Sequence, residues 1–411
     1  MTTIADRVAR PPPVGALALA ASIPAVAGLS AGEREVRIDL FRGLALWLIY
    51  IDHVSPDVLD WFTIRSYGFS DAAEIFIFIS GYTAAFVYGR AMQRFGFVIG
   101  TARIFRRVWS IYLAHVFLVT IYLAEIYFLA TSIGNPLYLQ EMGVLDFLRD
   151  PGEVLLQTLL LRFRPLNIDV LPLYVVLMTF LPFTLWLMKW QADVTLALSG
   201  VLYFLTWYFD WHLSAYPNSF WAFNPFAWQL LFVFGAWCAL GGARRVAIIC
   251  SSPVTTVISF AYLFAAFFVN MTWYFPQLSH LIPHRLEQWI YPIDKTDLDI
   301  LRFAHFLALA AVTVRFVPKD WRGLNSPWLR PLVLCGQHSL NIFCLGVFLA
   351  FAGYFVLFET NAGIGLHFLV GFIGIVLMTA VAWLNGWYKR SDAKAAAWRG
   401  PEGNADFVGG G

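Results

Sequence analysis

Long apolar segments separated by short polar ones dominate the chain. Each segment is close to 20 residues, the length of a helix that crosses the hydrocarbon core of a bilayer, and turn or charge signals separate the segments. The pattern predicts an all-α, polytopic membrane protein with about ten transmembrane helices. These spans are expected at residues 37–54, 71–90, 104–130, 170–188, 194–210, 225–241, 252–274, 300–317, 330–355 and 363–388.

The composition agrees with this fold class. Hydrophobic residues make up 59% of the chain and charged residues only 13%, a balance far from that of soluble domains. The net charge of +2 is small, and nucleic acid is not an expected partner. The four cysteines lie in or beside apolar runs without zinc-site spacing. We interpret them as packed thiols, and no metal site is expected.

The distribution of basic residues predicts the orientation in the membrane. If both termini are cytoplasmic, the inner segments carry most of the Lys and Arg residues, as the positive-inside rule requires. Residues 34–390 then form the membrane domain, between cytoplasmic tails at 1–33, which we expect to be disordered, and 391–411. A cleaved signal peptide is the alternative for residues 1–33, but the apolar run there is weak and contains Pro24.

The first span carries a polar stripe along an otherwise apolar helix. At 100° per residue, Asp39, Arg42 and His53 fall within a narrow arc of one face. At a rise of about 1.5 Å per residue, Arg42 and His53 are roughly 16 Å apart, about half a bilayer core. Ionisable groups in a span are costly unless they face a cavity or a partner, so each is a functional candidate. Interfacial anchoring and a water-satisfied histidine are the alternatives.

Glu74 is the second catalytic candidate. The second span begins with an expected N-cap, Asp71, and Glu74 lies one turn inside. Glu74 shares a face with small residues, including Gly81, that permit close approach of a neighbouring helix. Because Glu74 and His53 both lie near the outer ends of adjacent spans, we expect the carboxylate to orient His53 as a base. A buried structural carboxylate is the alternative.

Two further groups of polar residues lie on opposite sides of the membrane. Gln337, His338 and Asn341 occupy the cytoplasmic turns of the ninth span, where they are expected to form a polar lining on the side of Arg42; interhelical hydrogen bonding is the alternative. The outer group is expected to line a polyol site, with interfacial anchoring and an aromatic belt as alternatives. Its members are Asp169, Trp228, Lys295, Asp297, Arg302 and His305.

Several short motifs occur in order between residue 35 and about residue 356, and together they resemble the OpgC family. The ten residues between Arg42 and His53 also resemble the arginine-to-histidine motif of the acyltransferase-3 membrane superfamily. The OpgC-like motifs are Asp39-Leu-Phe-Arg42-Gly43, Asp52-His53, Ser70-Asp71-Ala-Ala-Glu74, Leu171-Pro172-Leu-Tyr174, Phe223-Asn224-Pro225, Trp228-Gln229, Asp294-Lys295-Thr296 and Cys335-Gly336-Gln337-His338-Ser339.

The resemblance implies an enzyme of the bacterial inner membrane that succinylates osmoregulated periplasmic glucans. It implies succinyl-CoA from the cytoplasm as a co-substrate, with no tightly bound cofactor, and a periplasmic glucan hydroxyl as the acceptor. His53 stands at the position of the essential histidine. Membrane lipids are further expected partners, and the resemblance leaves open glucan-biosynthesis proteins or a second copy of the chain.

These observations favour an acyl-CoA-dependent O-acyltransferase. Arg42 is expected to hold the donor, together with Arg37, Asp39, Gln337, His338 and Asn341. His53, oriented by Glu74, is expected to take the proton of the attacking hydroxyl. The rival hypothesis is a transporter or flippase, in which the same charges line a path and no covalent bond changes. The sequence shows neither an internal repeat nor paired broken helices, which argues against this rival.

Overall fold

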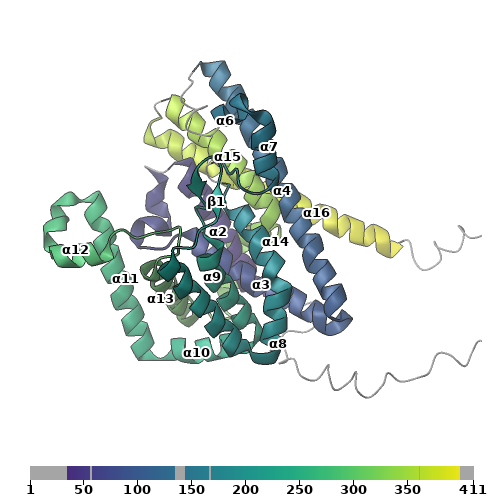
Figure 1. The fold of residues 1–411 in the computed structure, drawn as a ribbon, viewed down its shortest axis with the longest axis vertical. Helices are drawn as coiled ribbons and strands as arrows, with labels where there is room; N and C mark the ends of the chain where they lie inside the picture. Colours follow the sequence, from purple (N-terminus) through teal and green to yellow (C-terminus); the bar gives the residue numbers. More distant parts are fainter. Residues whose placement is uncertain (1–34, 56–57, 135–143, 166–167, 361, 399–411) are drawn as a thin grey trace, which may run out of the picture.

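The computed structural model describes residues 35–398 apart from 56–57, 135–143, 166–167 and 361. Its regular structure is almost entirely helical (Figure 1), which confirms the all-α prediction. The predicted tail at 1–33, and the part of the other tail beyond residue 398, lie outside the described residues.

The main helices are α2 (Val36–Val54), α3 (Ala72–Phe95), α4 (Phe97–Ile133), α6 (Val144–Arg149), α7 (Pro151–Leu159), α8 (Val170–Phe209), α9 (Pro225–Trp237), α10 (Ala243–Ser251), α11 (Pro253–Tyr274), α12 (His284–Ile290), α13 (Ile300–Phe316), α14 (Arg330–Gln337), α15 (Ser339–Glu359) and α16 (Ile364–Trp398). Shorter helical turns are Leu59–Phe62, Ile64–Tyr67, Cys238–Gly242, Pro276–Leu281, Arg322–Asn325 and Pro327–Leu329. Strands β1 (Ser214–Ala215) and β2 (Ser219–Phe220) pair antiparallel.

Seven helices of the described chain are long and apolar enough to cross a membrane. One of them, α8, has 40 residues and is therefore about 60 Å long, twice a bilayer core. Gln191 departs from helical dihedrals within it (φ −151°, ψ 94°), so α8 comprises two segments that match the predicted spans 170–188 and 194–210. Helix α2 carries too many charged residues and α13, with 17 residues, is too short to be among the seven. The count of about ten and the location of the termini stay predictions.

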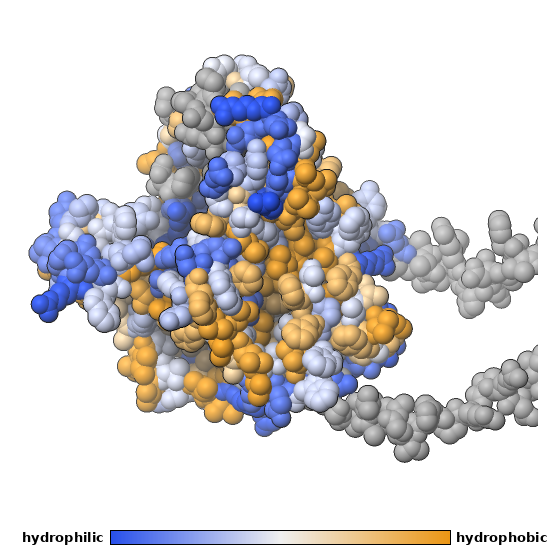
Figure 2. All heavy atoms as spheres, in the orientation of Figure 1, coloured by the Kyte–Doolittle hydropathy of each residue, from blue (hydrophilic) through white to orange (hydrophobic). Residues whose placement is uncertain are grey.

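The molecular surface is consistent with a lipid environment. Figure 2 shows hydrophobic side chains gathered over the middle of one face, with hydrophilic ones near α6 and α7 and around α12. Large aromatic side chains on α8, α11 and α16 are about two-thirds exposed, among them Phe204, Phe264 and Phe372. Apolar surface of this extent is unfavourable in water and is typical of contact with lipid.

Helix α2 lies at the centre of the packing that positions the polar stripe. It contacts α3, α14, α15 and α16. A Cβ at Gly43 would lie 1.8 Å from the carbonyl oxygen of Leu332, and one at Gly336 would lie 1.9 Å from that of Asp39. Two glycines thus let the backbones of α2 and α14 touch. The predicted close approach at Gly81 is also confirmed, because a Cβ there would lie 2.0 Å from the Phe232 oxygen of α9.

The predicted ninth span, 330–355, is interrupted. Helix α14 ends at Gln337 and α15 begins at Ser339, with His338 outside helical dihedrals between them (φ −116°, ψ 32°). Residues four apart share a face only where the helix is continuous. The prediction that Gln337 and Asn341 share one face of a single helix is therefore wrong. Of the two, Gln337 is half-buried and Asn341 is exposed.

Candidate active site along helix α2

Arg42 lines a cavity of about 110 Å³ between α2, α3, α4, α8 and α15. Its Nη2 donates to the carbonyl oxygen of Ile79 (3.3 Å) and to the hydroxyl of Thr83. Arg107 of α4 brings a second guanidinium to the same cavity. Hydroxyl groups in the lining come from Ser80, Thr83, Tyr88, Tyr174 and Ser339. Two guanidinium groups and several hydroxyl donors can bind a phosphate-bearing ligand. We call this space the Arg42 cavity.

The other residues predicted to bind the donor do not line the Arg42 cavity. Arg37 donates to the Val317 oxygen (3.1 Å) and pairs with Glu35 (3.1 Å), so it ties the start of α2 to the end of α13. The backbone of Asp39 packs against Gly336. Gln337, His338 and Asn341 are also outside the lining, and the start of α15 contributes Ser339, Leu340 and Phe343 in their place.

His53 lines a second cavity, of about 20 Å³, which we call the His53 cavity. The rest of its lining is mostly apolar and comes from α2, α4 and α15, together with the rings of Tyr50 and Tyr122. The Nδ1 atom of His53 lies 2.6 Å from the carbonyl oxygen of Ile49. A carbonyl oxygen only accepts, so Nδ1 carries the proton and Nε2 of the neutral ring is an acceptor. This tautomer suits a base that acts through Nε2.

Phe343 separates the two cavities. It is the residue of the described chain that lines both of them, and it is only 3% exposed. Its ring stacks on that of Phe76, with centroids 5.9 Å apart and planes inclined by 27°. Phe76 lines the Arg42 cavity but not the His53 cavity. A side chain of α15 therefore forms the common wall between the two candidate sites on α2.

Glu74 is fully buried, and its contacts are with residues other than His53. Its Oε2 accepts from the backbone N–H of Asp71 (2.9 Å), and the Asp71 side chain accepts from that of Ala73 (2.8 Å), which confirms the predicted cap. Its Oε1 accepts from Nε (2.9 Å) and Nη2 (2.6 Å) of Arg302. No hydrogen bond joins Glu74 to His53 among the described residues. These contacts match the structural alternative, and the Ile49 carbonyl orients His53 instead.

Three of the predicted site residues meet around Asp71. Its Oδ2 accepts from Nζ of Lys295 (2.6 Å) and from Nη2 of Arg302 (3.1 Å). We call Asp71, Glu74, Lys295 and Arg302 the Asp71 network. The charges of Lys295, Asp71 and Arg65 act on His53, so the network lies near that end of α2. The contacts run from Lys295 to Asp71, from Asp71 to Arg302 and from Arg302 to Glu74, so each buried charge has a partner of opposite sign.

His305 lies beside this network. Ser70 donates to its Nδ1 through both the backbone N–H (3.3 Å) and the hydroxyl (2.7 Å). Gly68 packs against the same ring, because a Cβ there would lie 1.9 Å from Nε2. His305 is 3% exposed. These contacts fix the turn before α3 and leave little of the ring open to an acceptor.

Trp228 and Asp169 are also held by structural contacts. Trp228 is fully buried, and its indole N–H donates to the carbonyl oxygens of Lys295 (3.0 Å) and Thr296 (3.1 Å). It therefore presents no open ring face on which a sugar could stack. Asp169 forms an ion pair of 2.6 Å with Arg164.

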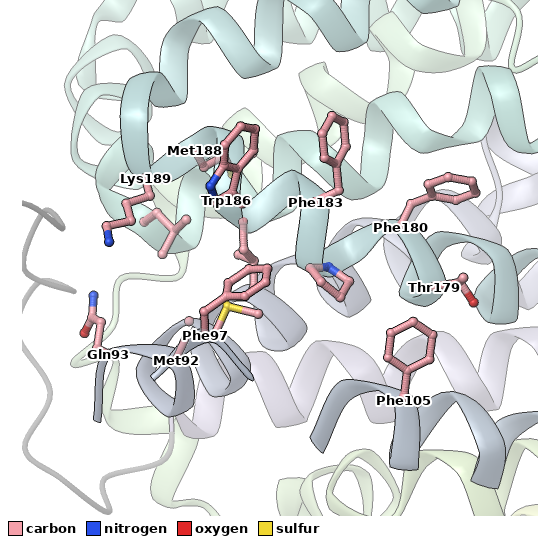
Figure 3. A pocket seen from close by; sticks show the side chains of 14 residues that line it. Met92, Gln93, Phe97, Phe105, Thr179, Phe180, Phe183, Trp186, Met188 and Lys189 are labelled. Carbon is pink, nitrogen blue, oxygen red and sulfur yellow. The ribbon is translucent and has the colours of Figure 1, made fainter. Parts of the chain in front are cut away.

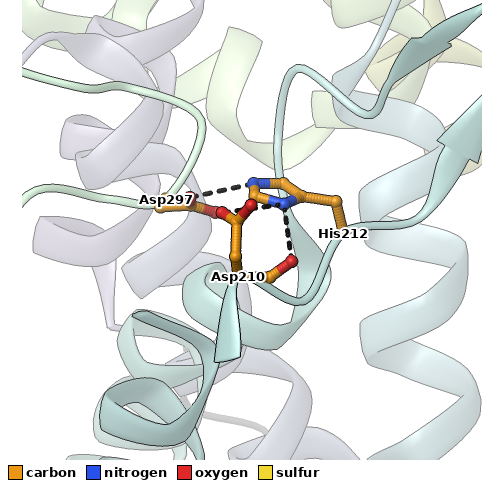
Figure 4. A group of neighbouring side chains, drawn as sticks. All are labelled: Asp210, His212 and Asp297. Atoms are coloured by element: carbon orange, nitrogen blue, oxygen red, sulfur yellow. Dashed lines mark hydrogen bonds and ion pairs between the residues drawn. The ribbon is translucent and has the colours of Figure 1, made fainter. Parts of the chain in front are cut away.

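Asp297 belongs to a cluster with Asp210 and His212 (Figure 4). Each of the three can offer one metal ligand atom, and these atoms lie within 4.8 Å of one another. However, Asp297 Oδ2 bonds to His212 Nε2 (3.0 Å), and Asp297 Oδ1 accepts from Asn224 (2.6 Å). The carboxylate is thus satisfied without an ion. Burial lowers the pKa of His212, but the Asp297 carboxylate together with the backbone carbonyl and carboxylate of Asp210 more than offset this, and the pKa lies above its ordinary value.

A third cavity shares no lining residue with the Arg42 and His53 cavities. It has a volume of about 690 Å³, and its lining comes mainly from α3, α4 and α8. Figure 3 shows aromatic side chains along it, including Phe97, Phe180 and Trp186, with Lys189 and Gln93 at one end. Neither Arg42 nor His53 lines it. Its aromatic walls suit an apolar chain.

Sequence reasoning missed three residues of this arrangement. Phe343 carries no signal in an apolar helix, since only its position between two cavities distinguishes it. In the sequence, Arg107 is one of the many basic residues that indicate only the orientation in the membrane. Asp71 was interpreted only as a helix cap, and its second role requires Lys295 and Arg302, which lie more than 220 residues away.

Residues 34–390 match a protein-family model described as OpgC protein. The match covers nearly the whole described chain, including Arg42, His53 and Phe343. No curated protein and no solved structure matches the chain.

Proposed function

We propose that this chain, which belongs to the OpgC protein family, is a membrane O-acyltransferase that moves an acyl group from acyl-CoA to a glucan hydroxyl. In this proposal the donor is succinyl-CoA, supplied from the cytoplasm, and the acceptor is a periplasmic glucan at the bacterial inner membrane. The single observation that carries the proposal is that Arg42 and His53 lie on one helix and line two cavities that share Phe343 as a wall.

The Arg42 cavity supplies the chemistry of donor binding. CoA carries several phosphate charges, and guanidinium groups bind phosphate oxygens through strong charge-assisted hydrogen bonds. Arg42 and Arg107 line the same cavity, whose hydroxyl groups add further hydrogen bonds. With phosphate held there, the pantetheine arm extends along α2 toward His53.

The His53 cavity supplies the base. Nε2 of His53 takes the proton of a glucan hydroxyl while its oxygen attacks the thioester carbonyl. The C–S bond then breaks, an ester C–O bond remains, and the proton passes from His53 to the CoA thiolate. The hydrogen bond from Nδ1 to Ile49 keeps the ring in the tautomer that this step requires.

Incubation of the purified protein with glucan and succinyl-CoA, labelled in the succinyl group, tests the proposal. We expect label on the glucan and release of free CoA, both abolished in His53→Ala with the protein level unchanged. Acetyl-CoA in place of succinyl-CoA tests the identity of the acyl group. Retained transfer by His53→Ala would remove the catalytic role. Movement of substrate across vesicles without acyl transfer would instead support the transporter hypothesis.

A further inference from the structure

The His53 cavity is too small for the group that has to reach it. Its volume of about 20 Å³ holds roughly one water molecule. Even the smallest acyl group, with its thioester, is several times larger than one water. If His53 acts on an acyl donor, part of the cavity wall has to move before the reaction.

We propose that Phe343 is a gate that admits the thioester from the Arg42 cavity to the His53 cavity. This inference rests on the proposed function and adds a residue that controls access to the base. Other residues of the His53 lining do not line the Arg42 cavity, so their displacement would enlarge the space around His53 without joining it to the donor site. Phe343 is the described residue that borders both cavities, so its ring is the side chain whose displacement we expect to join them.

The surroundings of Phe343 suit this role. On the Arg42 side its ring stacks on Phe76, so the closed position gains packing energy that is lost when the ring turns away. On the other side, the lining contains Gly346 and Ala350, small residues of the same helix. Phe343 also lies five residues beyond His338, where the backbone between α14 and α15 departs from helical dihedrals. A break of this kind is where the start of a helix can shift.

Substitutions that enlarge or shrink the side chain test the gate in the acyl-transfer assay. Phe343→Trp is expected to lower kcat at least about tenfold, with the affinity for acyl-CoA changed less than about threefold, because the donor still binds at Arg42. Phe343→Ala is expected to leave the passage open and to add hydrolysis, in which water attacks the thioester and releases a carboxylate and CoA thiol.

Phe355→Trp is the matched control, since Phe355 is a buried aromatic of α15 that lines neither cavity. Equal losses in Phe343→Trp and Phe355→Trp would show a general packing effect and overturn the gate. Wild-type kcat in Phe343→Trp would overturn it as well.

A second measurement does not depend on acyl transfer. Val347 lines the His53 cavity. In a cysteine-free chain with Val347→Cys, a small thiol reagent added from the Arg42 side of sealed vesicles is expected to react at least about tenfold faster when Phe343→Ala is also present. Equal rates would overturn the gate. The two proposals can therefore fail separately. If Phe343→Ala increases the rate of thiol reaction but the wild type transfers no acyl group, the proposed function is wrong, while Phe343 still controls access to the His53 cavity.

Discussion

Polar residues have opposite surroundings at the two ends of helix α2. At the Arg42 end, guanidinium and hydroxyl groups face a cavity of about 110 Å³. At the His53 end, the Asp71 network, His305 and Asp297 are largely buried, and hydrogen bonds of 2.6–3.3 Å join them to other protein groups. Clustered charged residues therefore form a candidate ligand site at the Arg42 end and a fixed structural framework at the His53 end. Open space beside the charge is what distinguishes them.

Within the framework, Lys295 differs from its partners. Its side chain is 42% exposed, whereas those of Asp71 and Arg302 are 10% exposed. Of the Asp71 network, Lys295 is thus the member best placed to meet a ligand from outside. Among the residues predicted to bind the acceptor, Trp228 and Arg302 are buried structural supports, whereas the side chain of Lys295 is accessible to a ligand.

Breaking the Asp71 network should have the largest effect on stability. Arg302→Met leaves Glu74 and Asp71 buried with less positive charge, and removal of one partner of a buried ion pair costs about 3–5 kcal/mol. We expect most of the variant to be lost as folded protein in size-exclusion chromatography. Arg245→Met, which removes an exposed pair with Asp193, should keep its wild-type elution profile. If adding Glu74→Leu to Arg302→Met fails to recover folded protein, the framework interpretation is wrong.

Removing a charge from the Arg42 cavity should change donor binding and leave the fold intact. A hydrogen bond to a charged group contributes about 1.5–3 kcal/mol, so Arg42→Ala should raise the KM for acyl-CoA about 10- to 100-fold. Arg37→Ala is the matched control from the same helix, because Arg37 contacts Glu35 and Val317 outside the cavity. An equal rise in KM for both variants, measured by steady-state kinetics, would contradict the assignment of the donor site to the cavity.

The smallest expected effect concerns His212 and its pairing with Asp297. Because the pKa of His212 is raised in the folded chain, protonation stabilises the fold below the ordinary pKa of about 6.5. This stabilisation is lost as the pH rises through the raised pKa. The Tm difference between wild type and His212→Gln in detergent should be less than about 2 °C. It should be larger at pH 5.5 than at pH 8.5, and a difference that increases with pH would rule out this account.

The sequence predicts the helices and their polar faces because these features are local. Apolar runs predict the long helices, and the spacing from Asp71 to Glu74 predicts the capping box that starts α3. The placement of Arg42 and His53 on one helix follows from the same periodicity. The close approach at Gly81 also requires only that a small residue lies on a buried face.

The sequence does not predict which distant groups meet. Glu74 was expected to orient His53, yet its partner Arg302 lies 228 residues along the chain. A helical period shows which way a side chain points, not which loop will fold against it. For the same reason, the sequence does not predict that the Trp228 indole bonds to carbonyl oxygens of the 294–299 segment. The break at His338 was missed because no proline or glycine stands at that residue.

The wall at Phe343 also has an electrical consequence. If the Arg42 cavity faces the cytoplasm and the His53 cavity the periplasm, as the proposed function requires, the membrane voltage is concentrated across the thin layer between them. In the predicted orientation, an anionic acyl group that passes this layer leaves a negatively charged cell interior. Each elementary charge that crosses 100 mV gains about 2.3 kcal/mol. The voltage of the cell would therefore help to deliver a succinyl group, and would give no such help to an acetyl group.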